Sequence, residues 1–285
     1  MNQTYANPNF DSSVLLEQCE NHMLGFIKDN EPSRFHLASG GSRTRAKLCI
    51  DAGTALQLPT SSIIALAGAV ELLHNASLVH DDLQDQESTR RNREAIWKKY
   101  GKAHAICAGD AMISAAFASL AHVGSAPSLS ALLIHMHEAV ATTVRGQSQD
   151  IDAHNKITEQ EYEDIAAMKS GPLIRLTLEL PLLMAGCNQY ISNAKFALSR
   201  FSIAYQILDD LDDWQQDAQR NQLNLVNLIA SKSSIQEAIT ISKNRAQYLL
   251  KQCEKELALL PANCASSFIR ASKSLLAKTT GTRNE

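Results

Sequence analysis

The sequence predicts an all-α protein, a single-domain bundle of about ten or more helices. Alanine and leucine are plentiful, and β-branched residues do not cluster in the alternating runs that are typical of strands. Only seven prolines occur in 285 residues, and none lies between Pro59 and Pro127. From Thr60 to about Tyr100 the chain contains one glycine, Gly68. Because residues that interrupt helices are so sparse, helix is favoured almost throughout.

In chain order, proline and glycine divide the sequence at 31–33, 58–60, 124–127 and 170–172. Thr60 and Thr158 occupy helix-capping positions, and Glu161 follows Thr158 at the spacing of a capping box. The expected helices span residues 11–29, 41–57, 60–85, 102–123, 128–150, 158–170, 172–186, 189–215, 234–259 and 262–278. Residues 1–285 therefore form one domain, with 1–10 and 279–285 expected to be mobile ends.

The composition excludes several classes of protein. Charged residues make up 20% of the chain, the net charge is -3, and no long run of one sign occurs, which argues against a nucleic-acid or membrane-surface partner. No apolar stretch approaches the roughly 20 residues needed for a membrane span, and the N-terminus has no signal-peptide core. The six cysteines are widely scattered, with no metal-type spacing, as expected for free thiols in a reducing cytoplasm.

Two acidic segments, DDLQD at 81–85 and DDLDD at 209–213, each end a long apolar helical pattern. On a helix, residues i and i+4 share a face and residue i+1 lies about 100° away, so three carboxylates leave one helix end together. Like charges at this spacing repel, which favours a compensating cation. Mg²⁺ suits hard oxygen ligands and binds through a few carboxylates plus substrate phosphates. A single such triplet is more often a solvated helix end, but two matching triplets favour a metal and diphosphate site.

Two arginine pairs accompany the acidic segments: Arg90 with Arg91, and Arg43 with Arg45 after a Gly-Gly break. A guanidinium group binds phosphate oxygens in a bidentate manner and keeps its charge. A surface arginine pair is usually solvated, yet two pairs beside two aspartate triplets indicate a phosphate-binding cavity.

Seven motifs follow one another along the chain: GGSRTR at 40–45, VELLHNASLVHDDLQD at 70–85, RR at 90–91, GDAMISAAF at 109–117, GQSQD at 146–150, KSG at 169–171 and AYQILDDLDD at 204–213. Over roughly residues 35–230 the chain resembles the trans-isoprenyl diphosphate synthases, or polyprenyl synthetases. The resemblance implies a helical bundle of the isoprenoid synthase type around a central cavity, usually homodimeric, with two DDxxD motifs that face each other across the mouth.

The resemblance implies a Mg²⁺-dependent prenyl transfer, in which isopentenyl diphosphate condenses with an allylic diphosphate to give a trans-polyprenyl diphosphate. Three Mg²⁺ ions are expected with substrate bound, held by Asp81, Asp82, Asp85, Asp209, Asp210 and Asp213. The catalytic residues implied are Asp81, Asp82, Asp85, Lys169, Asp209 and Asp210. The allylic diphosphate would contact Arg90, Lys169 and Gln206, and isopentenyl diphosphate would contact Arg43, Arg45, His74 and Arg91.

The chain also departs from the family pattern. Ser42 stands where a lysine is usual, Ala46 where a proline is usual, and Asn92 where a glycine is common. After Asp217 the chain reads DAQRNQLNLVNLIASK, without the family's GK pair or the threonine that follows it. These departures lie at the isopentenyl diphosphate site and in the loop that would close over the diphosphate.

The length of the product is expected to depend on residues along the tunnel for the tail. Ala76 and Ser77, one turn before Asp81, are small and leave the tunnel open, which predicts a geranylgeranyl or longer product. Leu73 lies on a deeper turn, and Phe117 would contribute to the floor, although both also fit an ordinary core.

Two alternative functions stay open from the sequence. One is a terpene synthase of the same fold, which ionises and cyclises a single allylic diphosphate. The other is a non-catalytic partner subunit of a heteromer. Arginines at 43, 45 and 91 argue against the first, and two complete DDxxD motifs argue against the second.

Overall fold

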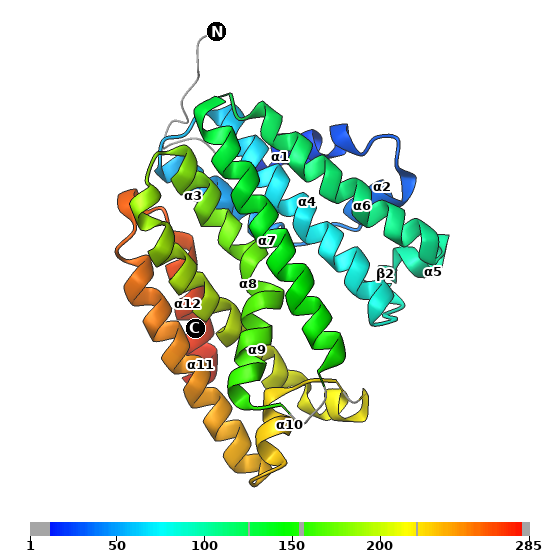
Figure 1. The fold of residues 1–285 in the computed structure, drawn as a ribbon, viewed down its shortest axis with the longest axis vertical. Helices are drawn as coiled ribbons and strands as arrows, with labels where there is room; N and C mark the ends of the chain where they lie inside the picture. The colour runs from blue at the N-terminus through cyan, green and yellow to red at the C-terminus, as the bar shows by residue number, and fades with distance from the viewer. Residues whose placement is uncertain (1–11, 125, 154–156, 221, 281–285) are drawn as a thin grey trace. The chain divides into compact units, whose positions relative to one another are not determined.

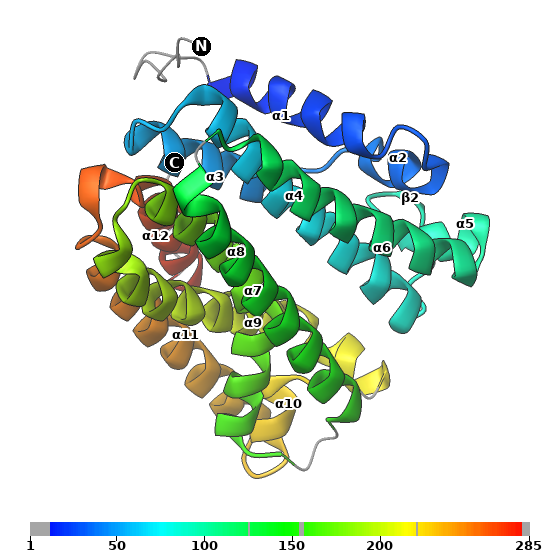
Figure 2. The same cartoon turned by 45° about the horizontal axis from the view of Figure 1, so that its top comes forward.

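The computed structural model describes residues 12–124, 126–153, 157–220 and 222–280, and the described residues form twelve α-helices and one short hairpin (Figure 1; Figure 2). The predicted all-α fold is confirmed. The expected mobile ends at 1–10 and 281–285 lie outside the described residues, whereas residues 279 and 280 close the last helix.

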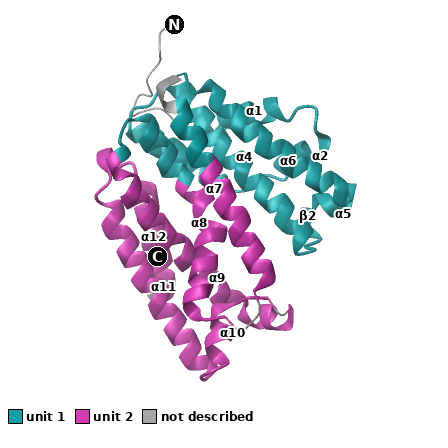
Figure 3. Ribbon diagram, in the orientation of Figure 1, with its two compact units in different colours: residues 1–136, 176–188 teal, residues 137–175, 189–285 magenta. Residues whose placement is uncertain are grey.

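The helices group into two compact units, coloured separately in Figure 3. Unit 1 contains residues 1–136 and 176–188, and unit 2 contains residues 137–175 and 189–285. Two long helices, α7 (Ala126–Asp152) and α8 (Glu159–Met184), contribute residues to both units.

Unit 1 is built around helix α4 (Thr60–Gln84), which packs against α1, α3 and α6. Its apolar residues are buried on every side, including Leu66, Val70 and Leu72, so α4 is the core helix of this unit. The other elements of unit 1 are α1 (Ser12–Phe26), α2 (Glu31–Leu37), α3 (Thr44–Ala55), β1 (Thr89–Arg90), β2 (Arg93–Glu94), α5 (Ile96–Tyr100), α6 (Lys102–Ser119) and the 3₁₀ turn η1 (Leu120–His122).

Unit 2 is built around helix α9 (Ile191–Arg220), which packs along α11 (Ile235–Leu257). The short helix α10 (Leu225–Ala230) contacts both of them, and α12 (Ser266–Thr280) packs on α11. Two further 3₁₀ turns are η2 (Asn188–Tyr190) and η3 (Pro261–Asn263).

The break expected at 31–33 is wrong, because helix α2 begins there. The side-chain oxygen of Asn30 accepts a hydrogen bond from the Ser33 N–H at 2.9 Å, and Pro32 lies in the first turn. Both are signals for a helix start. The N–H groups of the first turn lack intrahelical partners, so a side-chain acceptor stabilises them, and proline has no N–H that would need a partner.

The break expected at 170–172 is also wrong, because α8 continues through Pro172. A proline inside a helix costs about 3 kcal/mol. Burial outweighs that cost: Leu173 and Leu176 are buried after the proline, and Gly171 lets the Ser202 hydroxyl of α9 approach closely.

Of the two expected caps, one is confirmed. Thr158 and Glu161 form a reciprocal capping box: the Thr158 N–H donates to the Glu161 carboxylate at 2.7 Å, and the Glu161 N–H donates to Thr158 Oγ1 at 3.1 Å. Thr60 is not a cap, because α4 is capped by Pro59 without a side-chain hydrogen bond.

Two helical stretches are long and apolar enough to cross a membrane by length and composition alone, contrary to the sequence-based expectation. They are Thr60–Gln84 and Lys102–His122. In the first, 78% of the apolar window is buried inside the protein, as in a core helix; in the second, the buried share is 44%.

Candidate active site

The acidic segment at the end of α4 contains two kinds of carboxylate. We call Asp81, Asp82 and Asp85 the α4 carboxylates. Asp85 is exposed and Asp81 is half-buried, whereas Asp82 is only 1% exposed. The difference follows from helix geometry, because Asp82 lies about 100° from the face that Asp81 and Asp85 share.

An arginine compensates the buried charge of Asp82. Arg90 Nε donates to Asp82 Oδ1 at 2.8 Å, and Arg90 Nη2 donates to the same oxygen. Burial raises the pKa of Asp82, and the hydrogen bond and positive charge of Arg90 oppose that rise. The acid and the base that the sequence brings together are therefore bonded to each other, and Arg90 is held in place by an acidic side chain.

The hairpin β1–β2 positions both arginines of the RR motif. Thr89 pairs with Glu94 and Arg90 with Arg93, so that Arg91 and Asn92 form a two-residue turn. Both turn residues have positive φ, 54° and 61°, as a type I′ turn requires. Asparagine tolerates this conformation better than most residues, which explains how Asn92 serves where a glycine is common.

Arg91 lies against the Gly40-Gly41 break. Its Nη1 donates to the Gly40 carbonyl, and its guanidinium carbon would lie 2.5 Å from a Cβ at position 41. Gly41 also has a φ of +122°, which L side chains rarely adopt. Glycine at position 41 therefore supplies both the turn and the space for Arg91.

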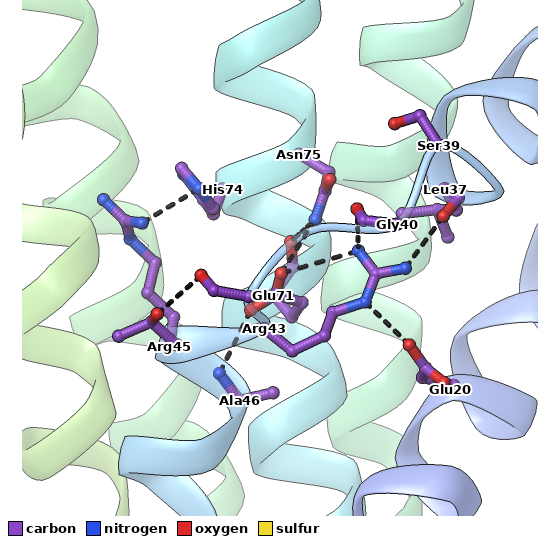
Figure 4. A network of polar contacts seen from close by, with 12 residues as sticks. Glu20, Leu37, Ser39, Gly40, Arg43, Arg45, Ala46, Glu71, His74 and Asn75 are labelled. Carbon is purple, nitrogen blue, oxygen red and sulfur yellow. Dashed lines mark hydrogen bonds and ion pairs between the residues drawn. The ribbon is translucent and has the colours of Figure 1, made fainter. Parts of the chain in front are cut away.

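Arg43 is buried in a network of protein contacts (Figure 4). Its Nε donates to Glu20 at 2.8 Å, its Nη2 donates to the Leu37 carbonyl at 2.8 Å, and its Nη1 lies 3.8 Å from Glu71. The buried Glu71 carboxylate also accepts the Ala46 N–H at 3.0 Å. A proline at position 46 would have no N–H to donate, so Ala46 is matched to Glu71 here.

Arg45 and His74 meet on the other side of the same network (Figure 4). Arg45 Nη1 lies 2.9 Å from His74 Nε2. Burial, then the charges of Arg45 and Arg91, lower the pKa of His74 well below its usual value. His74 is therefore neutral and accepts from Arg45 through Nε2. Ser42, in contrast, is exposed, and its hydroxyl bonds to Thr44 Oγ1 at 2.7 Å.

In unit 2, the acidic segment of α9 shows the same division. We call Asp209, Asp210 and Asp213 the α9 carboxylates. Asp209 and Asp213 are exposed, and Asp210 is 2% exposed. Partial desolvation, then the charges of Asp213, Asp212 and Asp217, raise the pKa of Asp209.

Neutral groups hold Asp210. Its Oδ2 accepts the Tyr162 hydroxyl at 2.7 Å and the Leu225 N–H at 2.6 Å, and its Oδ1 accepts the Gln206 amide at 3.0 Å. Burial raises the pKa of Asp210 to about 6, although all three hydrogen bonds oppose the rise. Gln206 is thus bonded to the middle aspartate of its own motif.

Lys169 donates to Asp150 Oδ2 at 2.6 Å, with both side chains about a quarter exposed. Helices α7 and α8 approach closely at this point: a Cβ on Gly146 would lie 2.5 Å from the Lys169 backbone nitrogen. One turn after Gly146, α7 therefore brings Asp150 to Lys169.

No group of three or more His, Cys, Asp or Glu side chains in the described part of the chain is close enough together to hold a metal ion. The exposed carboxylates Asp85, Asp209 and Asp213 are nevertheless the hard oxygen donors that Mg²⁺ prefers. Mg²⁺ commonly completes its coordination with water and substrate phosphates, so the carboxylates of either segment, taken by themselves, fit this ion.

A family model for polyprenyl synthetase matches residues 30–256. The chain belongs to the polyprenyl synthetase family. This family member is 29% identical over 209 residues to a short chain isoprenyl diphosphate synthase of Methanocaldococcus jannaschii, and 32% identical over 185 residues to a geranylgeranyl diphosphate synthase of Methanosarcina mazei. The matches cover 72% and 64% of this chain but 64% and 57% of those relatives, less than two thirds of their length.

Solved structures share the fold of this polyprenyl synthetase family member. A geranylgeranyl pyrophosphate synthetase from Geoglobus acetivorans superposes with a TM-score of 0.82 at 21% identity, covering 93% of this chain and 98% of the other. At this identity the likeness supports the all-α fold, as the helices of the two units do.

Several residues that hold the functional side chains in place could not be recognised from the sequence. Glu20, Glu71, Tyr162 and Asn224 come from other elements, and sequence spacing carried no signal for their contacts. Of the residues expected to set the product length, Leu73 and Ala76 are buried on α4, and Ser77 and Phe117 are half-buried on α4 and α6.

Proposed function

We propose that this protein is a Mg²⁺-dependent trans-isoprenyl diphosphate synthase, which joins isopentenyl diphosphate to an allylic diphosphate. The observation that carries the proposal is the division within both acidic segments. In each, the middle aspartate is held by protein donors while outer carboxylates stay accessible. A solvated helix end would not bury one carboxylate of each triplet.

In the proposed reaction the outer carboxylates of α4, Asp81 and Asp85, would hold Mg²⁺ with the diphosphate of the allylic substrate. The outer carboxylates of α9, Asp209 and Asp213, would supply a second set of Mg²⁺ ligands. Bound Mg²⁺ stabilises the negative charge that develops on the leaving diphosphate. We do not assign Asp82 and Asp210 as metal ligands in this proposal, because protein groups engage both carboxylates. Gln206 donates a hydrogen bond to Asp210, so we propose that it orients this carboxylate rather than contacting the substrate directly.

Fixed cations add to this stabilisation of the leaving group. Arg90, oriented by Asp82, and Lys169, oriented by Asp150, present positive charge that needs little rearrangement during the reaction. We assign both to the allylic diphosphate. Cleavage of the allylic C–O bond leaves a carbocation, which the double bond of isopentenyl diphosphate then attacks, and loss of a proton restores the alkene.

We assign isopentenyl diphosphate to Arg45 and Arg91, with the neutral His74 orienting Arg45. Arg43 is left out of this site, because its guanidinium is buried among Glu20, Glu71 and two backbone carbonyls. The hydroxyl of Ser42 is a weaker phosphate ligand than the lysine expected at this position, so we expect a KM for isopentenyl diphosphate that falls when Ser42 is replaced by lysine.

We propose a geranylgeranyl or longer product, because Ala76 is small and lies one turn before the α4 carboxylates. A buried Ala76→Tyr side chain should shorten the product. The named relatives include a geranylgeranyl diphosphate synthase and a short chain synthase, which is consistent with this range.

The test is incubation with Mg²⁺, isopentenyl diphosphate and dimethylallyl, geranyl or farnesyl diphosphate, followed by product sizing before and after phosphatase. Elongated diphosphates are the expected result. Hydrocarbon formed from farnesyl or geranylgeranyl diphosphate alone would instead indicate a cyclase, and no turnover with any primer would indicate a non-catalytic subunit. As a matched pair, Asp213→Asn should lower turnover at least about 100-fold, and Asp212→Asn, also exposed on α9, should lower it less than threefold.

We further propose a cytoplasmic homodimer. All six cysteines are free, which fits a reducing compartment. The apolar stretch Lys102–His122 is less than half buried, and Ile106 on α6 is 50% exposed, as expected for a helix that packs against a second copy. Light scattering should show a dimer that Ile106→Glu weakens and that Leu259→Glu, at a similarly exposed position (58%), does not.

A further inference from the structure

A buried asparagine ties the segment after α9 to the α9 carboxylates. Asn224 is 0% exposed and caps α10. Its Nδ2 donates to the Asp210 carbonyl at 3.0 Å and to Asp217 Oδ2 at 2.8 Å. Its Oδ1 accepts the N–H groups of Val226 at 2.9 Å and Asn227 at 3.3 Å. Both donors and the acceptor of this amide are therefore used.

The Asp210 carboxylate provides a second attachment of this segment to α9. Its Oδ2 accepts the Leu225 N–H, the residue directly after Asn224, at 2.6 Å. Leu225, Val226, Leu228 and Ile229 are buried behind this contact. The Asn227 side chain adds a third link, since it donates to the Trp214 carbonyl at 2.8 Å. The segment is held at three successive turns of α9.

These links act on a row of negative charge. Asp209, Asp213 and Asp217 follow at i, i+4 and i+8, so they lie along one face of α9 and repel each other. Asn224 gives Asp217 a neutral donor, and the bonds to Asp210 keep its carboxylate turned toward Tyr162 and Leu225. Asp209 and Asp213 are the exposed members of that row.

We infer that Asn224 is a positioning residue for the metal and diphosphate site of α9: by fixing Asp210 and Asp217, it leaves Asp209 and Asp213 as the ligand pair. This role rests on the proposed prenyl transfer and deepens it. Asn224 lies in the stretch that lacks the GK pair and the threonine after it.

The decisive variant is Asn224→Asp, which keeps the capping oxygen but loses both donors. Its matched control is Asn227→Asp, which places the same added charge on the same segment and loses only the bond to Trp214. In a Trp97→Phe background, Trp214 is the one remaining tryptophan of the chain and directly follows Asp213. Quenching of Trp214 fluorescence by Mn²⁺, with inorganic diphosphate present, therefore reports binding at α9.

We expect Asn224→Asp to raise the Mn²⁺ midpoint at least about tenfold, the usual effect of removing a group that orients metal ligands, and Asn227→Asp to change it less than twofold. The KM for the allylic substrate and the half-activating Mg²⁺ concentration should rise similarly, with the KM for isopentenyl diphosphate within twofold. Equal midpoints for the two variants would overturn the inference, as would a rise in both KM values together.

Two further measurements keep the test decisive. If Asn224→Asp does not fold, Asn224→Ser keeps a capping oxygen but cannot reach Asp217, and a midpoint raised at least about threefold is expected; an unchanged midpoint would overturn the inference. If the parent protein turns over no substrate, the proposed function fails, and the fluorescence titration still decides the role of Asn224. A parent whose Trp214 is not quenched by Mn²⁺ would overturn it.

Discussion

The α4 carboxylates and the α9 carboxylates have the same sequence pattern but different ways of holding the buried charge. Asp82 receives two donors from one cation, Arg90, on a single oxygen. Asp210 receives three neutral donors, from Tyr162, Gln206 and Leu225, distributed over both oxygens. The first arrangement compensates charge, and the second compensates hydrogen-bonding capacity.

The two ways of holding the buried charge require different numbers of structural elements. An ion pair needs one long side chain, and a two-stranded hairpin directly after α4 supplies it. Neutral donors must come from several places, so Asp210 joins α8, α9 and α10 at a single carboxylate. Asp210 therefore connects more helices through its hydrogen bonds than Asp82 does.

The comparison predicts its largest effect for removal of the two carboxylates. Asp210→Ala leaves the buried Tyr162 hydroxyl and Leu225 N–H without an acceptor, each at a cost of about 1–3 kcal/mol, so we expect a loss of about 4 kcal/mol in the free energy of unfolding. Asp82→Ala should cost about 2 kcal/mol or less, because Arg90 is 33% exposed and can be rehydrated. Urea unfolding of both variants measures the difference, and equal losses would contradict it.

A second effect concerns pH. The pKa of Asp210 in the folded protein, about 6, lies above its unfolded value, so the folded protein binds more protons between about pH 4 and 6. Stability contributed by Asp210 is therefore present at low pH and is lost as pH rises through this window. Relative to that of Asp210→Asn, the free energy of unfolding of the wild type should fall by up to about 3 kcal/mol between pH 4 and 6.5 and should not change further above pH 6.5.

The check is urea unfolding of both proteins without added metal at several pH values. For the pair Asp82 and Asp82→Asn we expect a smaller loss over the same range, because Arg90 opposes the rise in the pKa of Asp82. A wild type that gains stability over Asp210→Asn with rising pH would show that the neutral donors outweigh burial.

Long helices could be predicted from the sequence, and the burial of the middle aspartates could not. The expected helices at 60–85, 102–123 and 189–215 match α4, α6 and α9 because their apolar residues recur over many turns. The hairpin at 89–94 and helix α10 are too short to show a period, and the turn Arg91-Asn92 carries no glycine signal. Which of the three aspartates is buried depends on Arg90 and Tyr162, whose contacts no spacing rule gives.

The smallest effect concerns the hairpin that supplies Arg90. Asn92 has a φ of +61°, where alanine is disfavoured by about 1 kcal/mol and glycine is not. Asn92→Ala should therefore lower the free energy of unfolding by about 1 kcal/mol, and Asn92→Gly should leave it within about 0.5 kcal/mol. Thermal unfolding of both variants checks the order, and a loss for glycine as large as that for alanine would mean that the Asn92 side chain itself matters.

The close contact at Gly146 has a consequence for how this sequence can change over evolution. Helices α7 and α8 touch through their backbones there, and Asp150, four residues after Gly146, accepts a hydrogen bond from Lys169. Inserting or deleting one residue between Gly146 and Asp150 would turn Asp150 by about 100° and separate the pair. We therefore expect the length of the stretch 146–150 to be more strongly constrained than the identity of its exposed residues.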